Sequence, residues 1–202
     1  MLETPIRDRR AERRQATRAE ILEAAWDLAR TQGVAALSLG DVARRVGIRP
    51  PSLYWYFPSK NAIYDAMFAE ANRKLLERIA AQDWPDDLRE LLHAAARLFV
   101  AFGAEDVARY QLMFQRSIPD FEPSPEAYAL ALQVLEQMRE RFGVAGLNDP
   151  AHLDLWTALV AGLTAQQTSN EPGGDRWLRL TAEAADMYAD HVLEPKGPGG
   201  KT

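Results

Sequence analysis

The stretch SLGDVARRVGIRPPSLYWYFPSK, residues 38–60, decides the fold of this chain. Apolar residues recur at helical spacing through its first part and define one face of a short helix over 39–46. Ser38 is placed to cap the start of that helix with its side chain, and Asp41 follows three residues later as in a capping box. Gly47 then offers the left-handed turn that commonly follows a helix.

A second short helix, 51–57, is expected to follow this turn. Pro50 and Pro51 suit the first turn of a helix, where a missing N–H costs little. Leu53 and Phe57 lie four residues apart and should face inward. Two short helices joined by a glycine turn predict a helix-turn-helix, whose second helix enters the major groove of DNA.

Several groups of this motif suit contact with a DNA backbone. Lys60 stands at the N-terminus of the next helix, where exposed N–H groups also favour phosphate. Trp55 and Tyr56 can donate hydrogen bonds from their indole N–H and hydroxyl. A second phosphate position is expected at the preceding helix N-terminus, from Ser38 and the amides of Leu39 and Gly40.

The outer face of the second helix has an unusual chemistry for base recognition. Arg49, just before it, can make a bidentate contact to guanine. Pro50, Pro51 and the ring of Tyr54 suit thymine methyl groups, so DNA shape is expected to contribute to recognition. The three consecutive aromatics 54–56 cannot all face inward on a short helix. We therefore expect at least one to be exposed; the alternative is a partly buried aromatic cluster.

The motif LSLGDVARRVGIRPPSLYWYFPSK resembles the DNA-binding region of the TetR family of bacterial transcriptional repressors. The similarity extends upstream through RAEILEAAWDLARTQGVAAL. The resemblance implies that Ser52 and Tyr54 reach bases. It implies that Trp55, Tyr56 and Lys60 grip the DNA backbone. It also implies a second, all-helical domain that dimerises and binds a ligand.

Charge is divided unevenly along the 202 residues. Residues 1–60 hold 11 Lys and Arg against 7 Asp and Glu, whereas residues 61–202 hold 13 against 22. A basic N-terminal part on an acidic body concentrates nucleic-acid affinity at one end, although chance variation is an alternative. A cluster of arginines that can lie near phosphates or in a minor groove comprises Arg7, Arg9, Arg10, Arg13, Arg14 and Arg18. For 7–10, a solvated tail is the alternative.

The whole chain is predicted to be all-α, with no strand pattern and no internal repeat. A basic arm and helix-turn-helix domain is expected over 1–60, joined by a helix from 60 to about 81 to a ligand-binding and dimerisation domain over 84–193. Residues 1–10 and the tail 194–202 are expected to be disordered. The nine expected helices cover about 12–31, 39–46, 51–57, 60–81, 88–102, 105–116, 125–142, 150–169 and 175–193.

The last two helices carry apolar stripes that could pair two copies of the chain in a four-helix bundle. The alternative is that they pack only on their own domain, and the residues alone do not decide between the two arrangements. The resemblance favours the homodimer. The two stripes comprise Leu155, Leu159, Gly162 and Leu163, and Leu178, Ala182, Ala185 and Tyr188.

Large apolar residues of the second domain could wall a pocket for a small, hydrophobic effector of aromatic or acyl type. The alternative for each residue is a place in the core. The three-proline loop 118–125 could close over such a pocket. The candidate ligand-binding residues are Phe99, Phe102, Tyr110, Met113, Phe114, Tyr128, Trp156 and Gln166.

Other functional classes find little support in the sequence. The chain has no cysteine, its three histidines stand apart, and no catalytic or phosphate-binding motif occurs. We therefore expect no enzyme, no cofactor and no metal site. The basic arm would also suit an anionic membrane surface, but that role needs no second short helix. No apolar run is long enough to span a bilayer, so a cytoplasmic protein is expected.

The sequence therefore predicts a sequence-specific transcriptional regulator that binds double-stranded DNA. We expect a repressor that a small hydrophobic ligand releases from a palindromic operator. The alternative is a DNA-binding regulator without a small-molecule effector, controlled by a protein partner or by its expression level.

Overall fold

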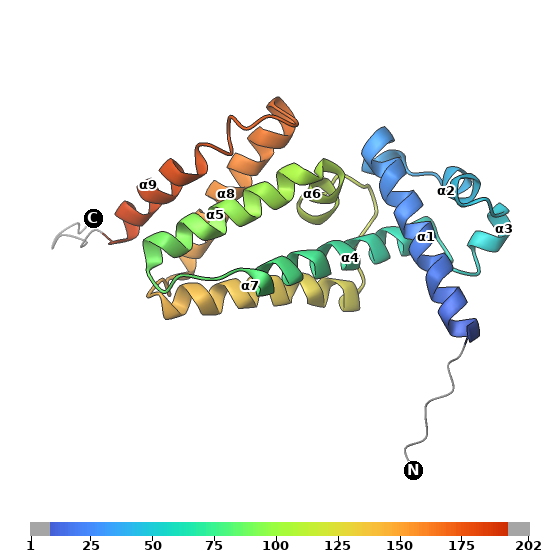
Figure 1. Ribbon diagram of the computed structural model, residues 1–202, viewed down its shortest axis with the longest axis horizontal. Helices are drawn as coiled ribbons and strands as arrows, with labels where there is room; N and C mark the ends of the chain where they lie inside the picture. Colours follow the sequence, from blue (N-terminus) through green and yellow to red (C-terminus); the bar gives the residue numbers. More distant parts are fainter. Residues whose placement is uncertain (1–8, 194–202) are drawn as a thin grey trace, which may run out of the picture. The chain divides into compact units, whose positions relative to one another are not determined.

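The computed structural model describes residues 9–193, and within this range the chain is all-helical, as predicted (Figure 1). The expected disorder of 1–8 and 194–202 lies outside the described residues. The elements are α1 (Arg9–Gln32), the 3₁₀ helix η1 (Val34–Ala36), α2 (Leu39–Val46), α3 (Pro50–Leu53), α4 (Lys60–Ala81), α5 (Leu88–Glu105), α6 (Val107–Phe114), α7 (Pro125–Val144), α8 (Pro150–Asn170) and α9 (Thr181–Leu193).

These helices form two compact units. In the first, which we call the head unit, the described residues up to Ala71 pack with Gln111–Tyr128. In the second, the body unit, Asn72–Tyr110 pack with the described residues from Ala129 onward. Helices α4, α6 and α7 therefore each contribute residues to both units.

The core of the head unit forms where α1 packs against η1 and α2. One face of α1 is buried, with Ile21 and Ala25 fully enclosed. Tyr64 of α4 is also fully buried, and its hydroxyl donates a 2.7 Å hydrogen bond to the carbonyl oxygen of Val34. Burial raises the pKa of Tyr64 to about 12. This bond ties the start of α4 to η1, the segment that leads into α2.

The glycine turn after α2 has the predicted geometry. Gly47 has φ +76°, in the left-handed region, and its N–H points back to α2. The N–H of Ile48 donates to the carbonyl oxygen of Ala43 at 3.0 Å, the pattern of a Schellman motif. At the other end of α2, Ser38 occupies the predicted N-cap position with extended backbone angles, but the predicted side-chain bond is missing. The Ser38 side chain makes no capping bond; its carbonyl oxygen accepts from the N–H of Val42 instead.

Two helix boundaries in the head unit differ from the predictions. Helix α1 already begins at Arg9, so Arg9 and Arg10 are helical rather than disordered. Helix α3 ends at Leu53, and residues 54–56 form a turn instead of continuing to Phe57. The following Pro58 explains the early end, because a residue that precedes proline disfavours helical backbone angles.

In the body unit, α5 is packed against both α8 and α9. Helix α5 continues past its predicted end at about residue 102, so that Gly103 lies inside it. A β-carbon at this position would collide with the side chain of Thr164 in α8, so the glycine permits close approach of the two helices. An aromatic cluster continues the core, with the Trp156 ring 6.2 Å from Phe142 and 5.2 Å from Tyr188.

Helix α9 begins six residues later than predicted, because a buried side chain organises the turn before it. The Gln167 side-chain oxygen accepts from the N–H groups of Trp177 and Leu178 at 3.0 and 3.2 Å. Its amide donates to the carbonyl oxygens of Glu171 and Gly174 at 2.6 and 3.0 Å. Gln167 is 1% exposed, so all of its hydrogen-bonding capacity serves this turn.

Helix α6 is shorter than predicted, and α7 runs past Gly143. Helix α7 ends at Val144, and Gly146, two residues later, has φ +94°, the left-handed backbone that is common after a helix end. None of the helices between residues 9 and 193 has the length and apolar character that crossing a bilayer requires.

Candidate nucleic-acid interface

The glycine turn sets α2 and α3 against each other so that one side of α3 is buried and the other is open. Leu53 and Phe57 are enclosed in the core, as predicted. Trp55 is 82% exposed and Tyr54 is 52% exposed, which confirms that at least one aromatic faces outward. The side chains of Arg49, Pro50 and Pro51 are also exposed, and those of Ser52 and Tyr56 are half-buried.

An interaction that the sequence analysis missed fixes the end of the α3 segment. The guanidinium of Arg18 donates to the carbonyl oxygen of Tyr56 and lies 4.1 Å from the centre of the Phe57 ring. Burial lowers the pKa of Arg18, and the positive charge of Arg14 lowers it further. Arg18 precedes the buried Ile21 by three residues, so helical spacing could have placed it on the inner face of α1.

The two predicted phosphate positions differ in the burial and the existing contacts of their side chains. Ser38, Leu39 and Gly40 are half-buried at the N-terminus of α2. Lys60 donates from its ammonium to the carbonyl oxygen of Ala35 at 3.2 Å, and it lies 5.4 Å from the centre of the Tyr64 ring. An ammonium has three donors, so Lys60 can bind phosphate while it also holds the head together.

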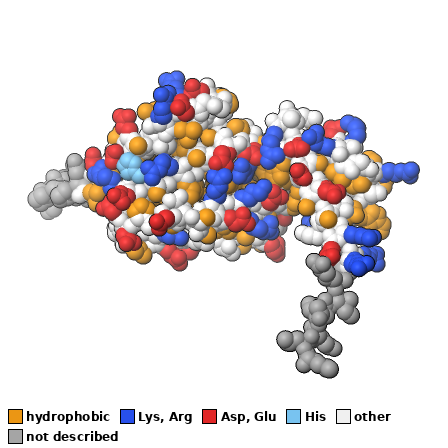
Figure 2. Space-filling model, in the orientation of Figure 1, with side chains coloured by type: hydrophobic (Ala, Val, Ile, Leu, Met, Phe, Trp, Pro, Cys, Tyr) orange, Lys and Arg blue, Asp and Glu red, His pale blue; other side chains and the backbone are white. Residues whose placement is uncertain are grey.

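A groove of about 630 Å³ lies between the N-terminal part of α1 and the residues after α3. Its α1 wall includes Arg10, Arg13 and Arg14, and Trp55 forms part of the facing wall. Figure 2 shows Lys and Arg side chains gathered at the start of α1. Within the described residues, Arg13 and Arg14 have no ion-pair partner. The cations of α2 differ, since Arg44 pairs with Asp41 at 2.7 Å.

A cavity of about 470 Å³ in the head unit brings together three of the predicted ligand-binding residues, Met113, Phe114 and Tyr128. Phe68 and the loop residue Phe121 also line it. Phe114 and Tyr128 are about half exposed although they are large and apolar or aromatic. The cavity is thus open, has both aromatic walls and polar lining residues such as Arg116 and Glu122, and is bordered by the 118–125 loop.

The other predicted ligand-binding residues lie elsewhere. Phe102, Tyr110 and Trp156 are buried in the body unit, and Phe99 is half-buried. Gln166 is exposed on α8, where its side-chain oxygen accepts from Asn170. The structure does not bring these five residues to the cavity formed by Met113, Phe114 and Tyr128.

The 118–125 loop is fastened to the first turns of α4. Asp65 accepts two hydrogen bonds from Ser124, one from its N–H at 2.6 Å and one from its hydroxyl at 3.0 Å. Asn61 donates to the carbonyl oxygen of Asp120 at 3.3 Å, and the ring of Phe121 lies 5.5 Å from that of Tyr64. The partners are far apart in sequence, so no local pattern could have predicted these contacts.

The apolar stripes on the last two helices are only partly exposed. On α8, Leu155 and Gly162 face outward, whereas Leu159 is half-buried. On α9, Ala182 is exposed, but Ala185 and Tyr188 are buried against their own unit. Those two residues therefore serve the body core and not an outer seam.

Two short helices, α2 and α3, are joined by a glycine turn in a small helical unit, and this arrangement defines the chain as a helix-turn-helix protein. Residues 21–67 match the family model of bacterial regulatory proteins of the tetR family. The class A tetracycline repressor protein from transposon 1721 of Escherichia coli is 37% identical over 79 residues, which are 39% of this chain and 36% of that protein.

Two further similarities extend beyond the head. The HTH-type transcriptional repressor Rv1353c of Mycobacterium tuberculosis is 26% identical over 162 residues, or 79% of this chain. The chain spans 59% of the length of that mycobacterial relative. The crystal structure of a TetR family transcription regulator from Marinobacter aquaeolei VT8 has a TM-score of 0.63 at 20% identity, covering 88% of this chain and 97% of that one. The family model, which covers residues 21–67, and the similarity to these repressors support the TetR family of regulators.

Proposed function

We propose that this protein is a cytoplasmic, homodimeric repressor that binds a palindromic DNA operator through α2 and α3. The observation that carries the proposal is the open segment directly after α3. Tyr54 and Trp55 are exposed there, and Arg13 and Arg14 of the adjoining groove have no ion-pair partner among the described residues. Side chains of this kind reach base edges and phosphates. The direction of control, repression, is supported by the name of the mycobacterial relative.

Two copies of the chain would place two heads on one operator. The exposed apolar residues of α8 and α9 support pairing through these helices, because Leu155 and Met187 are 54% and 67% exposed. A two-fold dimer reads two half-sites that are about one helical turn apart or a multiple of it.

The cavity at the 118–125 loop is the proposed effector site. Its volume of about 470 Å³ and the four aromatic residues among its lining support an aromatic or acyl compound, and Arg116 could meet a polar group of such a ligand. A ligand there would press on Phe121, which contacts Tyr64 of α4. Tyr64 in turn holds η1 through the carbonyl of Val34, directly before α2. A ligand that favours one position of this loop would therefore bias the position of the reading helices.

Retention of genomic fragments tests the DNA-binding part of this proposal. The full chain should retain a small number of fragments at physiological salt, and footprinting should show inverted half-sites in them. An aromatic or acyl compound that raises the melting temperature should also weaken this retention. Equal retention of all fragments would contradict sequence-specific regulation. Stabilisation by highly charged, hydrophilic compounds alone would contradict the proposed effector class.

The 118–125 loop gives a variant for the effector step. Phe121→Ala should remove the ring that links the cavity to Tyr64, so the effector should still bind but lose most of its effect on DNA affinity. Phe114→Ala removes a wall residue of the same cavity and should weaken effector binding itself. If Phe121→Ala left the loss of DNA affinity unchanged, the proposed route through Tyr64 would be wrong.

A further inference from the structure

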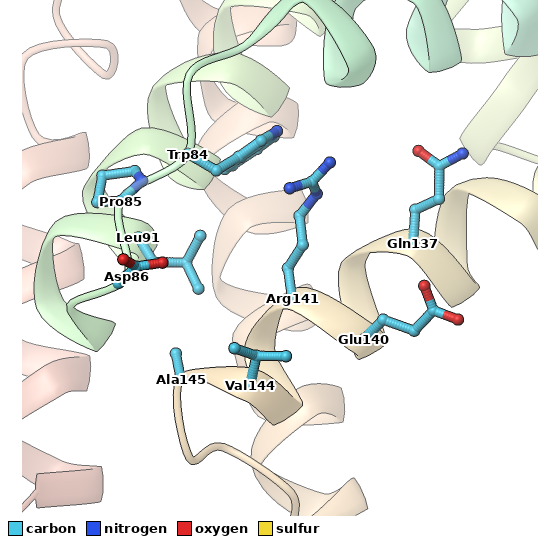
Figure 3. Close-up of a pocket in the computed structure, with 9 residues that line it drawn as sticks. All are labelled: Trp84, Pro85, Asp86, Leu91, Gln137, Glu140, Arg141, Val144 and Ala145. Carbon is cyan, nitrogen blue, oxygen red and sulfur yellow. The ribbon is translucent and has the colours of Figure 1, made fainter.

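A cavity in the body unit has no part in the proposed function. It has a volume of about 300 Å³ and lies between the connection that follows α4 and the C-terminal end of α7 (Figure 3). Trp84 and Asp86 line it from the connection, Leu91 from α5, and Arg141 from α7. This volume is at the small end of the range for small-molecule sites, so it suits a ligand about as large as an amino acid.

Arg141 is a cation held in place at this cavity. Its guanidinium carbon lies 5.1 Å from the centre of the Trp84 ring. The Trp84 indole N–H donates to the carbonyl oxygen of Ile79 at 2.8 Å, which fixes the ring under the guanidinium. The Nε atom of Arg141 is buried and has no hydrogen-bond partner among the described residues. The site thus presents a preorganised donor without an acceptor.

Two carboxylates line the same cavity but do not neutralise this cation. Neither Asp86 nor Glu140 forms an ion pair with Arg141 in the part of the chain that the structure describes. Figure 3 shows the Arg141 side chain extended toward Trp84, with the carboxylates of Asp86 and Glu140 lying apart from the guanidinium. Leu91 and Val144 supply apolar surface to the cavity.

We propose that this cavity binds a zwitterion of amino-acid size with an apolar side chain. The carboxylate of the ligand would accept hydrogen bonds from Arg141, and its ammonium would face Asp86 and Glu140. A simple anion would meet two carboxylates without compensation, and a simple cation would meet the guanidinium. This inference does not depend on the proposed DNA-binding function, because binding is measured on the chain alone.

Calorimetric titration with three matched compounds tests the charge requirement. L-leucine has both charges, N-acetyl-L-leucine keeps only the carboxylate, and L-leucinamide keeps only the ammonium. Leucine should bind, and each derivative should bind at least about tenfold more weakly, because one charged group of the site loses its partner. Equal binding of leucine and N-acetyl-leucine would overturn the proposal. So would the absence of leucine binding at concentrations up to about 10 mM.

Variants separate the site from a general effect of charge. Arg141→Gln should abolish leucine binding, whereas Arg139→Gln should not, since Arg139 is an exposed arginine of the same helix that pairs with Glu136. The double variant Asp86→Asn/Glu140→Gln leaves the Arg141–Trp84 contact intact. It should bind N-acetyl-leucine at least as well as leucine. A double variant that kept the wild-type preference for leucine would overturn the assignment, even if Arg141→Gln failed to fold.

Discussion

The arginines of the head groove and the arginine that joins α5 to α9 in the body differ in whether their charges are paired. In the head, Arg13 and Arg14 line an open groove and have no carboxylate partner within the described residues. In the body, Arg89 of α5 pairs with Asp186 of α9 at 2.9 Å and also with Asp190. The contrast teaches that the number of arginines in a region says less about its function than whether their charges are already paired.

If the body unit forms the dimer interface, the largest expected effect is the loss of the dimer when a charge is placed on α8 or α9. Leu159→Glu or Ala182→Glu would bury an unpaired charge in the proposed seam, which costs about 3–5 kcal/mol. Sedimentation equilibrium should show a dimer for the wild type and a monomer for these variants. Ala80→Glu, at an exposed position of α4, is the control and should stay dimeric. A monomeric wild type at micromolar concentration would remove the body's proposed role.

The polar groups inside the body should matter for stability and not for DNA. Gln167→Ala removes the side chain that makes four hydrogen bonds to the turn before α9. We expect the free energy of unfolding to fall by about 3 kcal/mol. Gln166→Ala, at the exposed neighbouring position, should change it by less than about 0.5 kcal/mol. Similar losses in urea denaturation for the two variants would contradict the structural role of Gln167.

Substitution of Arg13 and Arg14 in the head should affect DNA binding and leave stability nearly unchanged. Arg13→Ala/Arg14→Ala should weaken operator binding and reduce the slope of log affinity against log salt by about four for the proposed dimer, because two phosphate contacts are lost in each of its two heads. The free energy of unfolding should hardly change. The matched control Arg139→Ala/Arg179→Ala removes two exposed, paired arginines of the body. An equal decrease of the slope in both double variants would show a non-specific effect of net charge.

The smallest expected effect concerns acid stability of the body. The hydrogen bond from His93, followed by that from Arg89, lowers the pKa of Asp186 below its ordinary value of 3.8. The ionised carboxylate therefore stabilises the fold above that value, and this contribution is lost as the pH falls through the lowered pKa. Asp186→Asn should flatten the dependence of melting temperature on pH between about 2 and 5. Asp154→Asn, an exposed carboxylate of α8, should leave the dependence as it is in the wild type.

Much of the head could be predicted because its signals are local. The glycine at position 47 correctly predicted the turn after α2. The spacing of Leu53 and Phe57 correctly predicted which side of the α3 segment is buried. The three consecutive aromatics correctly predicted that at least one of them is exposed, but not that Trp55 is the most exposed. What the sequence did not indicate was the anchoring of this segment by Arg18, whose partner Tyr56 lies 38 residues away.

The body resisted prediction because its features depend on partners that are distant in sequence. The prediction that a helix ends at about residue 102 was wrong, since Gly103 lies inside α5 and packs closely against Thr164, sixty-one residues later. The stripe on α9 was recognised as apolar, yet periodicity could not tell a core-facing Tyr188 from an outward Ala182. Because periodicity does not reveal distant partners, it also could not separate the candidates that line the head cavity, such as Phe114, from those buried in the body core, such as Trp156. The domain limits and the residue assignments for DNA and ligand binding stay predictions.

The central claim is that the segment around α3 reads DNA sequence, and selection from random duplexes tests it most directly. Wild type and Tyr54→Ala would be selected in parallel at physiological salt. We expect the wild type to enrich an inverted repeat and Tyr54→Ala to lose preference at one position in each half-site while keeping the rest. No enriched motif with the wild type, or an identical motif with identical preferences for the variant, would contradict the account.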